Sequence, residues 1–198
     1  MMASSGRFEG GSLEDALNEA CSALNSRIEE IQYDVLEEKD GSVAVEAKVD
    51  PMAVLGLFLS EAFRAAKLDL SVRLREGRDA LVGDLTGSDF GLLAGGNGRG
   101  LDALQYLCNR VLNHRLREHQ PVHLDGDGFK GRRAEKLQVE AEEAADEAVR
   151  RRRPVTFAPM TPAARREIHL ALAEDPGVET VSDGEGFLKR VVVRPCRR

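Results

Sequence analysis

Residues 95–107 read GGNGRGLDALQYL, a glycine-rich turn followed at once by an amphipathic segment. The turn holds a Gly-x-x-Gly pattern made of Gly95, Gly96, Asn97 and Gly98. Apolar residues then recur at helical spacing, at positions 101, 104, 107, 108, 111 and 112. Glycines let a backbone approach a bulky anion closely, and the free N–H groups at a helix start attract that anion. Taken alone, the four residues also suit a flexible link between two helices.

The segments around this turn favour the anion-binding interpretation. Pro51 follows Asp50, a good helix cap, and begins a helical pattern. The order of predicted elements, α-β-β-α-α-β over residues 50–126, is that of a type II KH fold, which has its nucleic-acid clamp at this turn. The elements are helices at residues 52–68, 89–93 and 101–112 and strands at residues 68–74, 80–85 and 122–124.

The N-terminal part, residues 1–49, predicts a small βαββ-like module. Residues 13–24 carry apolar side chains at helical spacing. Residues 31–35 and 43–49 alternate as two strands around a turn at Asp40-Gly41, and residues 7–10 supply an edge strand. A module this small needs a partner surface to bury its sheet.

The C-terminal part, residues 127–198, predicts a long linking helix and an α/β domain. Residues 129–152 form a helix with a narrow alanine stripe, and Pro154 ends it. A strand, a helix and two strands follow, at residues 155–158, 162–173, 178–182 and 189–194. The basic residues Lys130, Arg132 and Arg133 at the start of the linking helix are expected to extend a basic surface. The whole chain is therefore predicted to be an α+β protein.

Charge separates these modules. The chain has a net charge of −6, which excludes a uniformly basic coat for nucleic acid. Residues 1–50 nevertheless hold 4 basic and 12 acidic side chains, whereas residues 151–198 hold 10 and 6. A polyanion is therefore expected to bind the C-terminal module.

Three scattered cysteines, Cys21, Cys108 and Cys196, form no metal or disulfide pattern and indicate reduced thiols in a cytoplasm. No apolar run reaches the roughly 18 residues of a membrane span. The first twelve residues lack the apolar core of a signal peptide.

An Arg-x-x-x-His pair stands in the C-terminal helix. Thr161 caps that helix and Pro162 occupies its first position, which puts Arg165 and His169 one turn apart on the same face. A planar guanidinium and an imidazole can together hold a phosphate, and protonation of the imidazole should strengthen that hold modestly at lower pH. Arg166 adds charge beside them. The last strand and the tail are expected to add more through their basic residues, Lys189, Arg190, Arg194, Arg197 and Arg198. The alternative is an ordinary solvated helix face.

Catalytic and metal motifs do not fit the sequence. The glycines run G-x-G-x-G after a helix and lack a following Lys-Ser or Lys-Thr, which excludes a Walker loop and a dinucleotide fingerprint. His114, His119 and His123 have no acid or thiol at metal-ligand spacing, and Phe129 occupies a ligand position of a calcium-like loop that starts at Asp125. We expect no enzyme activity, no metal, no cofactor and no small-molecule substrate.

Four stretches together resemble the bacterial Jag family, also called KhpB or EloR. They are LDALQYL at 101–107, LDGDGFKGRR at 124–133, PMTPAARREIH at 159–169 and the tail from 178 to 193. The resemblance is strong over residues 50–196 and weak over residues 7–49. It implies a Jag N-terminal domain at 1–49, a KH domain at 50–126 and an R-3-H domain, named for Arg-x-x-x-His, at 127–198.

The resemblance also implies a function. Members bind RNA or single-stranded nucleic acid in the cytoplasm, act with a small single-KH protein and take part in cell elongation and division. By position, the KH clamp is Gly95–Gly98 and the second phosphate grip is Arg165 with His169. We therefore predict a protein that binds single-stranded RNA at two sites on one chain.

Two departures from the family pattern leave alternatives open. Gly96 and Asn97 stand where the family has basic residues, so two phosphate-binding side chains are missing unless Arg99 replaces them. Residues 37–41, EEKDG, replace a basic glycine-rich loop of the N-terminal domain. These changes suit a protein-interaction adaptor whose KH domain no longer binds RNA, and a binder of single-stranded DNA is the third possibility.

Overall fold

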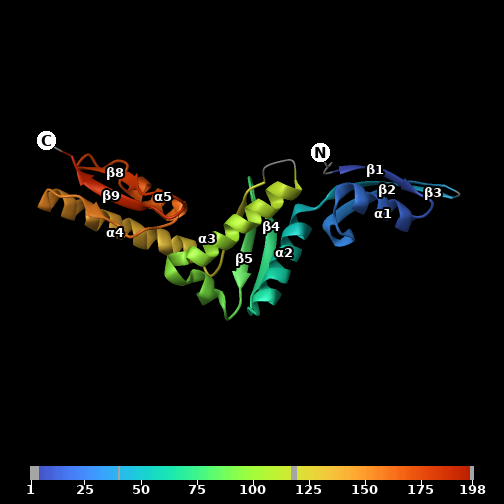
Figure 1. Cartoon of the computed structure of the whole chain (residues 1–198), viewed down its shortest axis with the longest axis horizontal. Helices are drawn as coiled ribbons and strands as arrows, with labels where there is room; N and C mark the ends of the chain where they lie inside the picture. Colours follow the sequence, from blue (N-terminus) through green and yellow to red (C-terminus); the bar gives the residue numbers. More distant parts are fainter. Residues whose placement is uncertain (1–4, 40, 117–119, 197–198) are drawn as a thin grey trace. The chain divides into compact units, whose positions relative to one another are not determined.

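The computed structural model describes residues 5–39, 41–116 and 120–196, and it contains three separate three-stranded sheets with helices packed on them (Figure 1). This confirms the α+β class. Packing groups the chain into two compact units. One runs from the N-terminal part to Leu93 and includes Ala103–Asp127, and the other joins Ala94–Asp102 to the chain from Gly128 onward. The division into three domains with the boundaries predicted above stays a prediction.

The first sheet has the expected βαββ arrangement. Its elements are β1 (Ser5–Gly10), α1 (Leu13–Leu24), the short 3-10 helix η1 (Ile28–Glu30), β2 (Ile31–Lys39) and β3 (Ser42–Val49). The strands pair antiparallel in the order β1-β3-β2. Ser12 caps α1 by accepting from the backbone N of Asp15, and Ala16 of α1 packs on Val43 and Val45. Asp40 of the expected hairpin turn lies outside the described residues.

The second sheet and its helices confirm the α-β-β-α-α-β order, since α3 consists of two helices joined at a kink. Its elements are α2 (Pro51–Ala66), β4 (Ser71–Glu76), β5 (Leu81–Thr86), α3 (Phe90–Arg115) and β6 (Val122–Asp125). Strand β5 pairs antiparallel with β4 and parallel with β6, and a parallel pair needs a crossover connection, here provided by α3. Asp50 caps α2 through the backbone N of Met52.

The glycine turn interrupts α3, which is two helices joined at a kink. Gly95 has an extended backbone, with φ −58 and ψ 158. Gly96, Asn97 and Gly98 then adopt three successive left-handed conformations, with φ of 60, 61 and 77. Glycine enters this region without a Cβ penalty and asparagine tolerates it better than most residues. The GGNG sequence therefore supplies residues that adopt the left-handed conformations of this kink with little strain.

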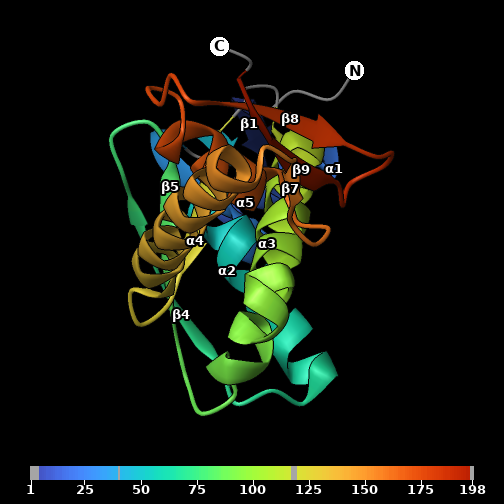
Figure 2. The same ribbon diagram turned by 90° about the vertical axis from the view of Figure 1, so that its left-hand side faces the viewer.

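The third sheet belongs to the C-terminal unit (Figure 2). Its elements are α4 (Phe129–Arg151), β7 (Val155–Thr156), α5 (Pro162–Ala171), β8 (Val178–Asp183) and β9 (Arg190–Pro195), with antiparallel order β7-β9-β8. Both helices pack on one face of this sheet, because the alanine stripe of α4, Ile168 of α5 and Val191 and Val193 of β9 share one core. Within the described ranges, none of the helices combines the length and apolar character needed to cross a bilayer.

Candidate nucleic-acid interface

Helix α5 presents the Arg-x-x-x-His pair next to its buried face. The Thr161 side chain caps the helix by accepting from the backbone N of Ala164, at 3.4 Å. Ala164 and Ile168 are buried in the core, which fixes the rotation of the helix. Arg165 and His169 follow one position later in each turn and are half-buried. The sequence-predicted pair therefore does share one face.

Two hydroxyl groups of β8 hold this pair in place. Arg165 Nη1 donates to Ser182 Oγ at 2.9 Å, and His169 Nε2 lies 3.0 Å from the same oxygen. His169 Nδ1 lies 2.7 Å from Thr180 Oγ1. Sequence reasoning missed both hydroxyl residues, although they alternate with the core residue Val178 along β8 and so had to face α5.

The charge of Arg165 is not neutralised within the described chain. Its hydrogen-bond partner is a neutral hydroxyl, and none of the described acidic residues lies within ion-pair distance of it. Its Nε is buried without a hydrogen-bond partner among the described residues. A cation pinned beside the surface without a counter-charge favours the approach of an anion.

The imidazole of His169 is held in its neutral form more strongly than usual. Burial lowers the pKa of His169 from its ordinary value of 6.5, and the nearby Arg165 charge lowers it further. The strengthening of an anion grip by protonation of this ring therefore begins at a more acidic pH than for an exposed histidine.

We expect the ring protons of His169 to titrate with a midpoint below 6.5 in the full chain, followed by NMR. The unfolded chain has the ordinary, higher pKa and binds the proton more readily, so this group destabilises the fold as pH drops below about 6.5. Above that pH it has no effect on stability. A midpoint at or above 6.5 would show that the ring is solvated and not held against β8.

The other predicted basic residues of this domain divide between two faces. Arg166 is exposed beside Arg165 on α5. Lys189 stands two residues before Val191 and so lies on the same face of the sheet, the face that packs on α5. Arg190 pairs with Asp183 and lies on the other face. The structure therefore does not bring Arg190 together with Arg165 and His169, because side chains alternate along β9, and its role in binding nucleic acid stays a prediction. Arg197 and Arg198 lie outside the described residues.

The glycine turn is exposed at Gly95, Gly96 and Asn97 and buried at Gly98. A Cβ at Gly95 would meet nothing within 4 Å, so this side of the turn is open. The Arg99 guanidinium lies over Gly96, where a Cβ would come within 3.3 Å of Nε. Arg99 is thus close enough to the turn to supply the positive charge that Gly96 and Asn97 lack, as expected from the sequence.

The buried side of the turn rests on α4. A Cβ at Gly98 would lie 2.6 Å from both Arg133 Nη1 and Phe129 Cε1, so only glycine fits there. Arg133 Nη1 donates to the carbonyl of Asn97 at 3.3 Å and to Asp102 Oδ2 at 3.1 Å. Asp102 also accepts from the Thr161 hydroxyl at 2.7 Å.

Arg133 therefore does not extend the basic surface as expected, since it is only 7% exposed. The spacing of Arg133 in the sequence could have predicted its burial. Arg133 stands four residues before Leu137, which precedes Ala141 by four, so it belongs to the buried stripe of α4.

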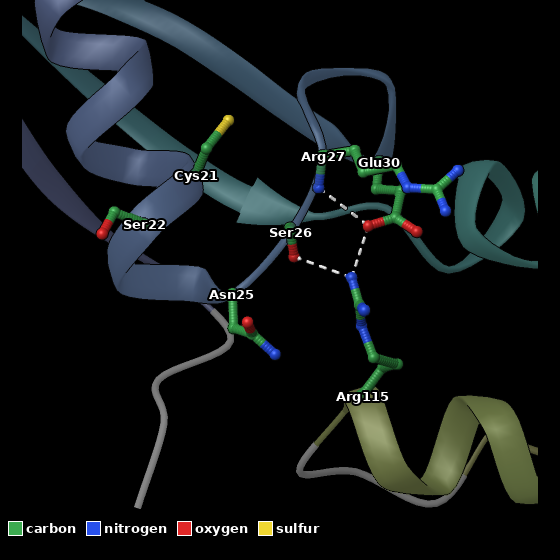
Figure 3. Close-up of a pocket in the computed structure, with 7 residues that line it drawn as sticks. All are labelled: Cys21, Ser22, Asn25, Ser26, Arg27, Glu30 and Arg115. Atoms are coloured by element: carbon green, nitrogen blue, oxygen red, sulfur yellow. Dashed lines mark hydrogen bonds and ion pairs between the residues drawn. The ribbon is translucent and has the colours of Figure 1, made fainter.

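The first unit contains a polar cavity whose charged lining residues form ion pairs. A cavity of about 420 Å³ in the first unit is lined by Cys21, Ser22, Asn25, Ser26, Arg27, Glu30 and Arg115 (Figure 3). Arg115 reaches from the end of α3 to the carboxylate of Glu30 and to Ser26 Oγ, and the backbone N of Arg27 donates to the same carboxylate. The charged side chains of this cavity are thus already paired, since Arg115 bonds to Glu30 and the Arg27 side chain bonds to Glu61.

No cluster of three or more metal-ligating side chains forms among the residues the structure describes. Of the three histidines considered above, His119 lies outside those residues.

Comparison with known proteins is consistent with this architecture. Residues 135–195 match the model of the R-3-H domain, and residues 8–42 match that of the Jag N-terminus. The RNA-binding protein KhpB of Clostridium symbiosum is 31% identical over 193 residues, which cover 91% of this chain and 87% of that protein.

Two further relatives carry the same name. KhpB of Bacillus subtilis (strain 168) is 24% identical over 93% of this chain and 95% of its own length. KhpB of Lactiplantibacillus plantarum is 39% identical over 52% of this chain and 32% of its own length.

Proposed function

Since the chain belongs to the Jag family, we propose that it binds single-stranded RNA through two sites: the glycine turn with Arg99, and the Arg165–His169 face of α5. The relatives are named for RNA binding, and the match extends over nearly the whole chain. We propose a binding role and not a catalytic one. The finer expectations, namely a cytoplasmic location, a small single-KH partner and a role in cell elongation and division, belong to the same proposal.

One observation carries the proposal: Arg165 keeps an uncompensated charge while hydroxyl groups hold it and His169 on the same spot. An exposed lysine gives up rotamer entropy when it grips a phosphate, whereas a guanidinium already fixed by Ser182 gives up less. Both ring nitrogens of His169 already lie within hydrogen-bond distance of hydroxyls on β8, so the neutral ring helps to hold Ser182 beside Arg165. The arrangement suits a backbone phosphate, because a guanidinium without a counter-charge offers positive charge and hydrogen-bond donors to phosphate oxygens.

The glycine turn supports a second contact. Its open side at Gly95 allows close approach, and Arg99 brings one positive charge over it. The absence of basic side chains at Gly96 and Asn97 should make this contact weaker than the α5 contact. The same feature favours the adaptor alternative for the KH domain, in which the turn makes no RNA contact at all.

Replacing Gly95 with Asp tests the turn directly. Gly95 has an ordinary negative φ and open space around its Cα, so a side chain is tolerated there without strain. The new carboxylate should repel phosphate and lower the affinity for a single-stranded RNA about threefold to tenfold, measured by fluorescence anisotropy. Gly98→Asp would be a poor test, because its side chain collides with Arg133 and Phe129.

The matched control is Gly131→Asp on α4. That site is also open and lies in the same unit. Phe129 and Arg133 face Gly98, so position 131, halfway between them in the helix, projects from the opposite side of α4 and adds the same charge there. If both variants weaken binding equally, the effect is general electrostatics and the turn makes no contact, as the adaptor alternative requires. Competition between RNA and DNA oligomers of one sequence separates the third possibility, since only RNA offers a 2′-hydroxyl.

A further inference from the structure

Three buried polar side chains meet between the glycine turn, α4 and the start of α5. We call Asp102, Arg133 and Thr161 the buried triad; they are 8%, 7% and 3% exposed. Among the described residues one other polar side chain, Glu30, is equally buried. Burying charge is costly unless it is paired and hydrogen-bonded, and here each member of the triad bonds to another. None of the three belongs to either proposed RNA contact.

Arg133 connects the triad to the turn itself. One of its nitrogens donates both to the Asn97 carbonyl inside the turn and to Asp102 directly after it. Its guanidinium also lies over the Phe129 ring, with Cζ 5.7 Å from the centroid. Gly98 packs against these same two side chains. The shape of the turn is therefore set by α4 and not by the turn residues alone.

Thr161 connects the triad to the second site. A hydroxyl has one hydrogen and two lone pairs, so Thr161 can donate to Asp102 while it accepts from the backbone N of Ala164. The residue that fixes the start of α5 is thus fixed in turn by a carboxylate next to the glycine turn. Arg165 follows that cap by one helical turn.

We propose that Asp102, Arg133 and Thr161 are positioning residues that hold the glycine turn and the Arg165–His169 face in one arrangement, so that a single RNA strand engages both. This inference rests on the proposed RNA binding. Two contacts held at a fixed spacing raise the affinity for a strand that reaches both, because the second contact forms at a high effective concentration. A loosened spacing lowers that gain without altering either contact.

The test compares oligouridines of two lengths with the full chain. An oligomer of about five nucleotides reaches one contact, and one of about twenty reaches both. Arg133→Met should lower the affinity for the long oligomer about tenfold and that for the short one less than twofold. Lys136→Met is the control, since it removes the same charge from an exposed position of α4 and should leave the ratio of the two affinities unchanged.

Equal decreases for both lengths in Arg133→Met, or the same ratio as in Lys136→Met, would overturn the proposal. If Arg133→Met lacks a cooperative thermal transition, Thr161→Val takes its place and Thr161→Ser, which keeps the hydroxyl, becomes the control. The same change in the affinity ratio is then expected for Val and not for Ser.

A measurement without RNA separates this inference from the proposed function. Thr161→Val should speed the amide hydrogen exchange of residues 96–98 relative to Thr161→Ser, although the substituted side chain bonds to none of them. Faster exchange in the turn without RNA supports the proposal that the buried triad links the turn to α5. If the wild-type chain then binds neither oligomer, only the proposed RNA binding is refuted. Exchange that changes in α5 alone would refute the linkage.

Discussion

Replacing Arg165 and His169 together with Ala is expected to lower the affinity for single-stranded RNA tenfold or more. The change removes the uncompensated guanidinium and the imidazole that share Ser182. Each phosphate neutralised on a single strand contributes about 0.7 to the slope of log K against log salt, so the slope should become shallower by about that amount for each phosphate that the variant no longer binds. Binding isotherms at several salt concentrations measure both effects.

Arg194→Ala provides the control for this experiment. Arg194 lies on β9 opposite Glu179, on the face of the sheet that α4 and α5 do not cover, and its replacement removes one positive charge from the same domain. Its effect should be small compared with that of the double variant. A double variant that keeps the wild-type affinity and salt slope would place the RNA-binding site elsewhere. Thermal unfolding shows whether removing the hydrogen bonds to β8 has destabilised the domain.

Asp102→Ala is expected to destabilise the C-terminal unit by about 3–5 kcal/mol, the cost of leaving a buried charge without its partner. The guanidinium of Arg133 is almost inaccessible to water and would be left without its carboxylate, while the Thr161 hydroxyl would be left without its acceptor. Denaturant unfolding, followed by a probe in the C-terminal unit, measures the change in stability. The two packing units need not unfold together, so the probe has to report on one of them.

Glu140→Ala is the matched surface variant for that measurement. Glu140 pairs with Lys136 on α4 at 3.7 Å, and both side chains are exposed, so the decrease in stability should be roughly 0–1 kcal/mol. The double variant Asp102→Leu with Arg133→Met should recover much of the stability, because apolar side chains of similar size can replace a buried ion pair. A decrease in Asp102→Ala no larger than in Glu140→Ala would mean that water reaches the triad.

Most elements could be predicted because each one's periodicity reflects its buried face. The alternation of Val43, Val45 and Ala47 predicted β3, and these residues are buried in the first sheet. The GGNG run predicted the break before the second half of α3, since three left-handed residues in succession require glycine or asparagine.

The site was predicted only in part. The spacing of Arg165 and His169 placed them on one face, because helical geometry alone decides this. Their anchors Thr180 and Ser182 are polar residues on a short strand, and many hydroxyls occur on strands without any such role. The basic residues of the last strand were predicted from charge alone, and only the register of β9 shows that Arg190 lies on the face opposite to Arg165 and His169.

By itself, the sequence determined which segments become helices and strands, where the chain turns, and that Arg165 and His169 share one helix face. These follow from contacts between near neighbours in the chain. Only the tertiary structure decided that Asp102 bonds to Arg133 and Thr161, which are 31 and 59 residues away. Such bonds form because folding brings together charged and polar groups that must be satisfied once buried, and no local pattern states which groups will meet.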